Sequence, residues 1–456
     1  MGHANAQQQS VCGWGRHPQL YGTVARPEQR AAVSQFVATH RSVLPQGARR
    51  SYGDAALHDD GLMLRMTRLN RMLAFDADTG VLRAEAGVRL RDILTVFVPR
   101  GWFLPVTPGT KAVTLGGAVA FDVHGKNHHC DGGFSAFVRE IELLTADGAV
   151  LRCSPERNED VFWATVSGAG LTGVMTEVSL QLTPIETAFI VQRSIKARDL
   201  DDAFALFERH EPHHPYAVAW IDCLAPGHRL GRSHVLFGRH AVPRDLSAEQ
   251  RTAPLAYTPS RLGRLPVDLP SGVLNRATVR AFNELYYARQ RTRDRRTVTG
   301  LDAFFYPLDA IGDWNRMYGP RGFVQFQCVL PLEESYAGLV SLLETVQQHG
   351  HASFLAVLKR LGPPDGGLLS FPMHGYTLAL DLPYRDGLPA LMDRLHEIVL
   401  QHDGRVYLAK DAYLRPDMVR AMYPQLPEWQ AVKRAVDPNT RFGSALARRL
   451  AMVPAA

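Results

Sequence analysis

The sequence has few cysteines, and none of them lies close to another. It contains five among 456 residues, an odd number, and no C-x-x-C motif. They are Cys12, Cys130, Cys153, Cys223 and Cys328. This scatter argues against a disulfide framework and against a zinc site made of cysteines, so reduced thiols are expected.

Long apolar runs are absent too. No 18 consecutive residues are apolar, so no membrane-spanning helix is expected. Residues 1–19, MGHANAQQQSVCGWGRHPQ, contain no apolar core, so no signal peptide is expected. These features predict a protein of the cytoplasm or one attached peripherally to the inner membrane. They leave open a periplasmic location and the membrane face that is used.

The excess of one charge is small. The chain has 51 lysines and arginines and 45 aspartates and glutamates, a net charge of +6. That excess is too small to predict nucleic-acid binding, although a basic chain suits an anionic partner such as a phosphate or a membrane surface. The densest basic run, RQRTRDRR at 289–296, is compatible with a solvated surface and with contact to an anionic lipid or phosphate.

The residues that are present predict a globular α+β protein. A hydrophobic fraction of 46% supports a sizeable core, and the length corresponds to two or three domains. Residues 26–40 have the apolar spacing of a helix. In 140–154, Asp147 and Gly148 form the two-residue turn of a predicted hairpin. Residues 42–47 are predicted to form a short strand that runs into a loop, and 81–88 and 174–184 alternate like strands.

The second half of the chain has a different pattern. Five prolines and little periodicity at 242–271 predict a long mobile loop. Further on, 322–332 and 375–383 are predicted strands. Residues 404–411, GRVYLAKD, are predicted to form a last strand that ends at Lys410.

Two glycine-rich stretches suggest one extended ligand that contains a phosphate bridge. Residues 46–56, QGARRSYGDAA, offer backbone amides to an anion. Residues 107–125, TPGTKAVTLGGAVAFDVHG, let the backbone approach a ligand closely. A third stretch, GAGLTG at 168–173, matches G-x-G-x-x-G, but the alternating residues after it predict a strand rather than the helix of a dinucleotide site. A turn near a ligand is therefore expected there.

The segment HGKNHHCDGG at 124–133 concentrates histidines. His124 and His128 have the H-x-x-x-H spacing that can bind zinc on a helix. Gly125 and the Asp-Gly-Gly that follows disfavour a regular helix, and no third ligand has a familiar spacing, so no metal is expected. Two interpretations remain, a loop with structural histidines and a loop that faces a ligand or substrate, where Lys126 supplies a positive charge.

Several stretches together resemble the decaprenylphosphoryl-ribose oxidase family, the flavoprotein half of a two-protein 2′-epimerase and a branch of the vanillyl-alcohol-oxidase type of FAD enzymes. They are, in order, RSYGDAA, TPGTKAVTLGGAVAFDVHGKNHH, LLTADG, VFWATVSGAGLTGV, WNRMYG, VQFQ, LKRLGP, LSFP, AKD, AMYP and EW. The resemblance extends from Gly13 to the C-terminal LARRL, is most specific at DVHGKNHH and is weakest at 200–300.

The resemblance implies an α+β fold in two parts. Residues 1–190 and 405–456 would form an FAD-binding domain of the vanillyl-alcohol-oxidase type. Residues 191–404 would form an inserted substrate-binding domain on an antiparallel sheet, with its mobile loop at about 242–271.

The resemblance also assigns residues to the site. Those matched to FAD contacts are Gly47, Arg50, Ser51, Tyr52, Gly53, Gly109, Thr114, Gly116, Gly117, Asp122, His124, Val174 and Tyr407. Those matched to the substrate are Lys126, Gln327, Lys359 and Tyr52. Lys410 and His124 are both candidates for the catalytic base. Tyr52 stands where some relatives carry a histidine linked to FAD, so the flavin is expected to be noncovalent.

The implied reaction is oxidation of the 2′-hydroxyl of a polyprenyl-phosphoryl-β-D-ribofuranose to the 2′-keto sugar. A separate NAD(P)H-dependent short-chain reductase would then give the arabinofuranose, a precursor for cell-wall arabinan. Peripheral membrane contact is compatible with such a lipid substrate. Two alternatives are kept: a soluble sugar or aldonolactone oxidase on the same scaffold, and a flavin-binding subunit without turnover of its own.

The sequence departs from the family pattern at three positions. Arg49 replaces a glycine of the first loop, which would cost about 1 kcal/mol if the position is left-handed. Ala379 replaces the cysteine that covalent nitroaromatic inhibitors attack, so that trapping is not expected here. Phe305 replaces a tyrosine and is expected to reshape the pocket wall.

Overall fold

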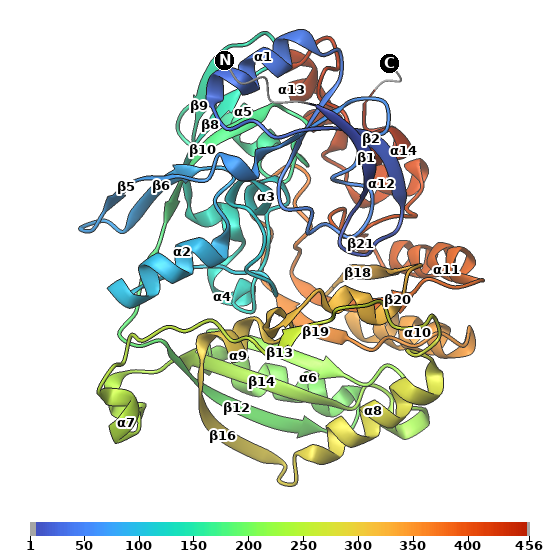
Figure 1. The fold of residues 1–456 in the computed structure, drawn as a ribbon. Coiled ribbons are helices and arrows are strands. Elements are labelled where there is room, and N and C mark those ends of the chain that lie inside the picture. The colour runs from blue at the N-terminus through green and yellow to red at the C-terminus, as the bar shows by residue number, and fades with distance from the viewer. Residues whose placement is uncertain (1–5, 454–456) are drawn as a thin grey trace.

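Three larger β-sheets with helices packed on them make up the fold in a computed structural model that describes residues 6–453 (Figure 1). Two of these sheets come from the first 184 residues, and the third comes mainly from the second half of the chain. Helices and strands of both orientations are mixed, which confirms the α+β prediction. No helix within residues 6–453 is long and apolar enough to span a membrane.

The first sheet holds the N-terminal strands. In spatial order it contains β1 (Gln7–Cys12), β2 (Gln19–Ala25), β4 (Leu62–Arg65) and β3 (Val43–Gln46). Helix α1 (Arg30–Thr39) connects β2 to β3 and buries Val33 and Val37. Both the helix predicted at 26–40 and the strand predicted at 42–47 are therefore confirmed.

The second sheet is antiparallel throughout. In spatial order it contains β5 (Met72–Asp76), β6 (Val81–Glu85), β10 (Val174–Gln181), β8 (Val138–Leu144) and β9 (Val150–Cys153). The hairpin of β8 and β9 turns at Gly148, whose φ of +88° suits glycine, as the sequence predicted.

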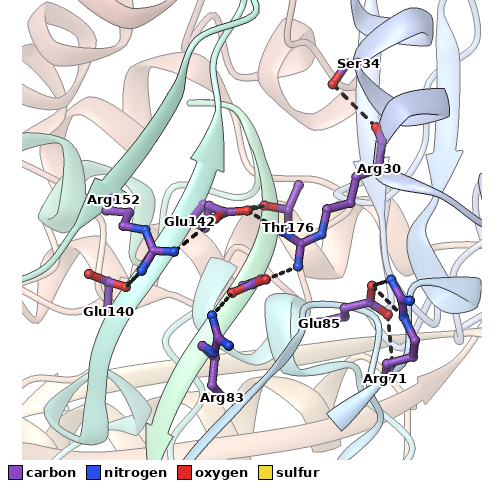
Figure 2. Close-up of polar contacts among 10 residues, drawn as sticks. Arg30, Ser34, Arg71, Arg83, Glu85, Glu140, Glu142, Arg152 and Thr176 are labelled. Carbon is purple, nitrogen blue, oxygen red and sulfur yellow. Dashed lines mark hydrogen bonds and ion pairs between the residues drawn. The ribbon is translucent and has the colours of Figure 1, made fainter. Parts of the chain in front are cut away.

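Three glutamates form a row across the middle of this sheet. Glu177 of β10 is in register with Glu85 of β6 on one side and with Glu142 of β8 on the other. Like charges on neighbouring strands repel, so the row needs cations. Arginines supply them: Arg30 of α1 contacts both Glu142 and Glu177, and Arg71 donates to Glu85 (Figure 2). The row thereby fixes α1 against the sheet.

The third sheet has eight strands, all antiparallel. Its spatial order is β16 (Asp294–Gly300), β12 (Phe189–Ala197), β14 (Ser233–His240), β13 (Tyr216–Ile221), β19 (Ala356–Leu361), β20 (Gly375–Pro383), β18 (Phe323–Pro331) and β21 (Arg405–Val406). The strands predicted at 322–332 and 375–383 are β18 and β20. Three helices cover its apolar face: α6 (Leu200–His210), α10 (Ser335–Gln348) and α11 (Leu388–Gln401).

Shorter elements complete the fold. The remaining helices are α2 (Leu90–Phe97), α3 (Leu115–Ala120), α4 (His128–Asp131), α5 (Glu159–Thr165), α7 (Ala248–Arg251), α8 (Arg276–Arg289), α9 (Leu301–Phe305), α12 (Pro416–Met422), α13 (Leu426–Val436) and α14 (Ala445–Arg449). Two small pairs of strands are β7 (Trp102–Phe103) with β11 (Thr183–Pro184), and β15 (Gly263–Arg264) with β17 (Ile311–Gly312).

The C-terminal helices return to the N-terminal part of the molecule, as the blue and red ends of the chain show at the top of Figure 1. Trp429 of α13 donates to the carbonyl of Ala164 in α5, and Arg449 of α14 pairs with Asp54. This return supports the domain division, which we propose with the boundaries 1–190 plus 405–456 and 191–404. Residues 1–5 and 454–456 lie outside the described residues.

One predicted strand is much shorter than expected. The strand predicted at 404–411 is only β21, and Lys410 lies in a turn in which its amide donates to the carbonyl of Tyr407. The chain leaves β18 there because its backbone bonds to the first glycine-rich loop instead, where the amide of Tyr52 donates to the carbonyl of Ala409. The prediction that Lys410 ends a strand was therefore wrong.

The segment predicted to be mobile, 242–271, contains little regular structure but several tethers. Tyr257 and the amide of Ser260 both donate to Asp302. Asp268 pairs with Arg16 and Arg316. The mobility of this segment stays a prediction.

Candidate active site

A cavity of about 720 Å³ lies between the loops of the N-terminal part and the eight-stranded sheet. The first glycine-rich stretch lines it with residues 45–52, and the second with 108–114, 116 and 117. The sheet contributes Gln325 and Gln327 of β18, Val357 and Lys359 of β19, and Ala379 of β20. The two stretches that the sequence singled out thus meet the inserted sheet at one cavity.

Glycines let backbone segments pack closely around this cavity. A Cβ at Gly47 would lie 2.3 Å from Oγ1 of Thr114, which joins the two glycine-rich stretches. A Cβ at Gly116 would lie 2.9 Å from Cβ of Ala86. At Gly109 nothing lies within 4 Å, so its backbone faces open space. Such close backbone packing beside open space suits a long ligand with a phosphate bridge.

The arginine pair of the first loop adopts two different roles. Arg49 has a φ of +56°, the left-handed conformation for which a glycine would be suited. The backbone strain that was expected if Arg49 adopted a left-handed conformation is therefore present. Arg50 stacks its guanidinium on Trp14, with 4.0 Å from Cζ to the ring centre, and its buried Nε has no hydrogen-bond partner. A buried donor without a partner at the cavity wall fits an anionic ligand.

His124 lines the cavity, is buried and is neutral. Burial, and after it the neighbouring Lys359, His128 and Lys410, hold the pKa of its imidazole well below the usual value. Its Nε2 accepts from the side-chain amide of Gln327 at 3.0 Å, which leaves the proton on Nδ1. Nδ1 has no partner in the protein. His124 is therefore prepared to donate a hydrogen bond to a ligand atom.

Lys410 lies above the ring of Tyr52, with its Nζ 3.8 Å from the ring centre. Burial lowers the pKa of this lysine to about 7, against the attraction of Asp381. A lysine with that pKa can take up or release a proton near neutral pH. Tyr407 lies nearby and holds its own hydroxyl against the carbonyl of Phe121 at 2.9 Å.

Asp381 is the site residue that sequence reasoning missed. It is fully buried on β20 and accepts from the amide of Gln325 and from the hydroxyl of Tyr318. Burial raises the pKa of its carboxyl to about 7. The signal was available in GYTLALDLP, where an aspartate interrupts an apolar strand in the interior of a sheet, because such a residue is rarely buried without a partner or a function.

The two lysines matched to the substrate, Lys359 and Lys126, have different surroundings. Lys359 lines the cavity, and burial lowers the pKa of its ammonium to about 8. Lys126 does not line it: its Nζ donates to the carbonyls of Phe304 and Phe305 at 2.5 and 3.3 Å. Burial and Lys359 lower the pKa of Lys126 to about 7.

Three residues matched to FAD contacts lie just behind the cavity wall. A Cβ at Gly53 would overlap the carbonyl of Asp411. Asp122 is buried and accepts from the amide of Ser135 and the hydroxyl of Ser370. Val174 lies between Gly173 and Met175, which do line the cavity. Their contact with a cofactor stays a prediction, as do the contacts of the lining residues Gly47, Arg50, Ser51, Tyr52, Gly109, Thr114, Gly116, Gly117, His124 and Tyr407.

Ala379 and Phe305, the two departures from the family pattern in the inserted region, lie in different surroundings. Ala379 lines the cavity between Gln327 and Val357, its register partners on the neighbouring strands. Phe305 does not line the cavity; its ring packs on Phe103 and Tyr216, with centres 5.1 and 4.9 Å apart.

The histidine-rich block at 124–133 joins separate parts of the chain. Lys126 reaches Phe304 and Phe305, as described above. The side-chain amide of Asn127 donates to the carbonyl of Pro105. Nδ1 of His128 accepts from the amide of Gly362 at 3.0 Å, and Nε2 of His129 lies 3.2 Å from the carbonyl of His214. The block is thus a junction that brings His124 to the cavity.

The stretch GAGLTG leads into a strand, β10, and not into a helix. Its residues Ala169, Gly170 and Gly173 line the cavity, and Ala169 has a φ of +53°. The interpretation as a turn near a ligand, rather than a Rossmann fingerprint, agrees with this geometry.

Comparison with known proteins points to the same chemistry. A family model described as FAD binding domain matches residues 18–154, and a model described as D-arabinono-1,4-lactone oxidase matches 323–450. Over 450 residues, 97% of each chain, the protein is 38% identical to decaprenylphosphoryl-beta-D-ribose oxidase of Mycolicibacterium smegmatis. It is 24% identical to alditol oxidase of a Streptomyces species over 86% of each chain. It is 23% identical to L-gulono-1,4-lactone dehydrogenase of Mycobacterium tuberculosis over 94% of this chain and 95% of that one.

The residues of the cavity fit the cofactor that these matches imply. The matched FAD binding domain contains both glycine-rich stretches, whose thin walls and unpaired Arg50 suit the pyrophosphate of a dinucleotide. The neutral His124 and the lysines Lys359 and Lys410, all of which line the cavity, suit the flavin and an oxidisable substrate. The chain belongs to the decaprenylphosphoryl-β-D-ribose oxidase family of FAD-dependent oxidoreductases.

Proposed function

We propose that this protein oxidises the 2′-hydroxyl of a polyprenyl-phosphoryl-β-D-ribofuranose to the 2′-keto sugar. The observation that carries the proposal is the near full-length match to a relative named for this oxidation, together with the meeting of His124, Lys359 and Lys410 in one corner of the cavity. FAD supplies the hydride acceptor when it is bound.

We assign a separate role to each residue in this corner of the cavity. Lys410, whose pKa lies at about 7, takes the proton of the 2′-hydroxyl. His124 cannot do so through Nδ1, because Gln327 donates to Nε2 and keeps the proton on Nδ1. His124 therefore orients the substrate or cofactor by donating from Nδ1. We therefore propose Lys410 rather than His124 as the base.

Lys359 is assigned to the phosphate of the substrate. It lines the cavity on β19, carries a compact positive charge and donates to no other residue within 6–453. Lys126 does not line the cavity and its ammonium already donates to the carbonyls of Phe304 and Phe305, so its effect on the substrate is assigned to be indirect. Gln327 and Tyr52 complete the substrate side of the corner.

The flavin is proposed to be noncovalent because Tyr52 stands at the place of the linking histidine in other relatives. Denaturation in acid should release all of the FAD into the supernatant. Yellow colour that stays with the precipitated chain would contradict this part of the proposal.

The product requires a second protein. A 2′-keto sugar becomes the arabinofuranose by hydride addition from the opposite face, which needs a nicotinamide. GAGLTG leads into β10 rather than a dinucleotide-binding helix, so this step is assigned to a separate NAD(P)H-dependent short-chain reductase.

A soluble aldonolactone or sugar oxidase is the second candidate, favoured by the match of residues 323–450 to the D-arabinono-1,4-lactone oxidase model. The deciding experiment is anaerobic incubation with polyprenyl-phosphoryl ribose while the flavin absorbance is followed. The proposal expects bleaching. Bleaching by free lactones or sugars instead would favour the second candidate. A flavin that light reduces but no substrate bleaches would indicate a subunit without turnover.

A further inference from the structure

The net charge of the molecule comes from one segment. Residues 261–296 contain nine arginines and three acidic residues, an excess of six that equals the net charge of +6 of the whole chain. The other 420 residues therefore balance, with 42 basic and 42 acidic side chains. We call residues 261–296 the arginine segment.

Acidic residues do little to cancel these arginines. Glu284 pairs with Arg232 and Asp294 with Arg193, both outside the segment. Within residues 6–453, seven exposed arginines of the segment take part in no ion pair. They are Arg261, Arg276, Arg280, Arg289, Arg291, Arg295 and Arg296.

The same segment exposes apolar side chains. Eight large hydrophobic residues of the described chain are prominently exposed, and four of them lie here. They are Leu262 (80%), Val267 (63%), Val273 (40%) and Leu285 (73%). Single exposed hydrophobic residues scattered over a surface need no explanation. Here, however, four of the eight lie within 24 residues of the chain, which calls for one.

Helix α8 organises part of this surface. Asn275 caps it by accepting from the amides of Ala277 and Thr278. Its inner side packs Tyr286 on Trp220, with ring centres 4.6 Å apart, and Phe282 on Phe354. Its outer side exposes an apolar stripe at helical spacing, flanked by arginines. The stripe consists of Ala277, Ala281, Leu285 and Ala288.

The surface begins at the rim of the cavity. Arg261 lines the cavity, and the exposed Leu262 follows it directly. Trp220, on which α8 packs, is in register with Val357, a cavity residue, so α8 and the cavity share one face of the eight-stranded sheet. In Figure 1, α8 lies at the lower right, outside that sheet.

We propose that the arginine segment binds the surface of an anionic lipid bilayer. Leu285 and the other exposed apolar side chains enter the headgroup region, and the free arginines contact lipid phosphates. The proposal rests on the proposed function, since a membrane at the cavity rim would present a lipid-phosphate substrate to the site. Arginines around apolar residues fit this partner better than they fit a second copy, whose own arginines would repel them.

The test is sedimentation of the purified holoprotein with vesicles of phosphatidylcholine, with and without phosphatidylglycerol. The wild type should bind the anionic vesicles, more weakly as salt rises. Arg295→Glu/Arg296→Glu should weaken binding on the order of 25-fold or more, because each arginine near an anionic surface contributes a factor of about five. Leu285→Asp should weaken it as well.

Matched controls separate the segment from general charge and apolarity. Arg209→Glu/Arg420→Glu makes the same charge change at exposed arginines elsewhere, and Val150→Asp changes a side chain that is 57% exposed on β9. Both should bind vesicles like the wild type. Equal binding by all variants, or no binding by the wild type, would overturn the proposal. So would a dimer that Leu285→Asp dissociates without any vesicle binding, since the surface would then join two copies.

Failure of the proposed function would look different. Bleaching by a short-chain, water-soluble polyprenyl-phosphoryl ribose should be unchanged in Leu285→Asp, because the side chain lies outside the cavity. If the substrate bleaches the flavin of the wild type but the wild type does not bind vesicles, only the membrane-binding proposal is rejected. Vesicle binding without bleaching leaves the surface standing and rejects the function.

Discussion

Single residues in the corner of the cavity owe their chemistry to burial. Desolvation lowers the pKa of Lys410 to about 7 and raises that of Asp381 to about 7. The same effect keeps His124 neutral. A charged lysine would hold the hydroxyl proton of a substrate in place, whereas a neutral one removes it, so these values place the reaction near neutral pH.

Replacing Lys410 by alanine should leave FAD bound and slow the substrate-dependent bleaching of the flavin by about 10²–10³-fold. The loss follows because Lys410, which lines the cavity with its Nζ over the ring of Tyr52, is the group assigned to take the hydroxyl proton. Stopped-flow absorbance measures it. Lys196→Ala serves as control, since that lysine packs on Tyr287 away from the cavity. Unchanged bleaching in Lys410→Ala would return the role of the base to His124.

The pH dependence of bleaching should identify the partner of Lys410. Only the neutral lysine accepts a proton, so the rate should rise with pH and level off above about pH 7. The carboxylate of Asp381 raises the pKa of Lys410, so Asp381→Asn should move this inflection to lower pH. The half-buried Asp393, which does not line the cavity, serves as control: Asp393→Asn should not move the inflection. An unshifted inflection in Asp381→Asn would show that Asp381 does not influence the pKa of Lys410.

The sequence could identify site residues whose type and motif stand out. It could not identify those whose role depends on contacts made only in the folded protein. His124, Lys359 and Lys410 lie in motifs and do line the cavity. Lys126 lies in the most specific motif, yet its ammonium is occupied by carbonyls of α9, 178 residues away in the chain. Asp381 was overlooked because its importance comes from Gln325 and Tyr318, which only the folded sheet brings to it.

At the scale of elements, the first glycine-rich loop carries a strained residue. Replacing Arg49 by glycine should raise the free energy of unfolding by about 0.5 kcal/mol, since relief of about 1 kcal/mol of left-handed strain is partly offset by the freedom of glycine in the unfolded chain. Denaturant unfolding of the holoprotein measures the change. The neighbouring Ala48→Gly, where φ is negative, should instead lose about 0.5–1 kcal/mol. Equal losses in both variants would contradict the argument.

The glutamate row of the second sheet makes a prediction of its own. Arg30→Ala removes the cation shared by Glu142 and Glu177 and should cost about 2 kcal/mol of stability. Adding Glu177→Gln removes the repulsion and should recover at least about 1 kcal/mol. Arg68→Ala, whose partner Glu28 is exposed, should change stability by less than about 0.5 kcal/mol. Additive losses in the double variant would argue against coupling across the row.

Elements with local signals were predictable, and those fixed by distant partners were not. The hairpin of β8 and β9 follows from Asp147 and Gly148, and β10 from its alternation. The apolar alternation of GRVYLAKD suggested a strand, but its second half bonds to the first loop, 357 residues away, and forms a turn. The order of strands in the large sheet likewise has no local signature.

At the scale of the whole molecule, buried histidines and a buried glutamate lie where separate parts of the chain meet. The block at 124–133 reaches the inserted region through His128 and His129, and His129 faces Glu211 at 3.4 Å. Burial lowers the pKa of His129 to about 4 and raises that of Glu211 to about 7. These groups are mostly neutral in the folded protein near pH 6, and their contributions to the pH dependence of stability have opposite signs.

Acid should therefore destabilise the whole protein between pH 6.5 and 4.5. Burial lowers the pKa of four histidines to about 4: His58, His129, His240 and His351. As pH falls below 6.5, the unfolded chain binds protons that these residues cannot accept while folded, so each lowers stability by at most about 1.4 kcal/mol per pH unit. Solvent screening reduces this value. Glu211 and Asp381, whose pKa values are raised to about 7, oppose the trend, but two groups do not offset four.

Denaturant unfolding of the holoprotein at pH 6.5, 5.5 and 4.5, in excess FAD, measures this slope. His240→Gln should reduce it by up to one proton, because burial alone lowers the pKa of His240 and its Nε2 lies 3.2 Å from the hydroxyl of Tyr216, which glutamine can also contact. The exposed His213→Gln should keep the slope of the wild type. A stability that does not fall with pH, or an identical slope in His240→Gln, would show that these histidines accept protons in the folded state.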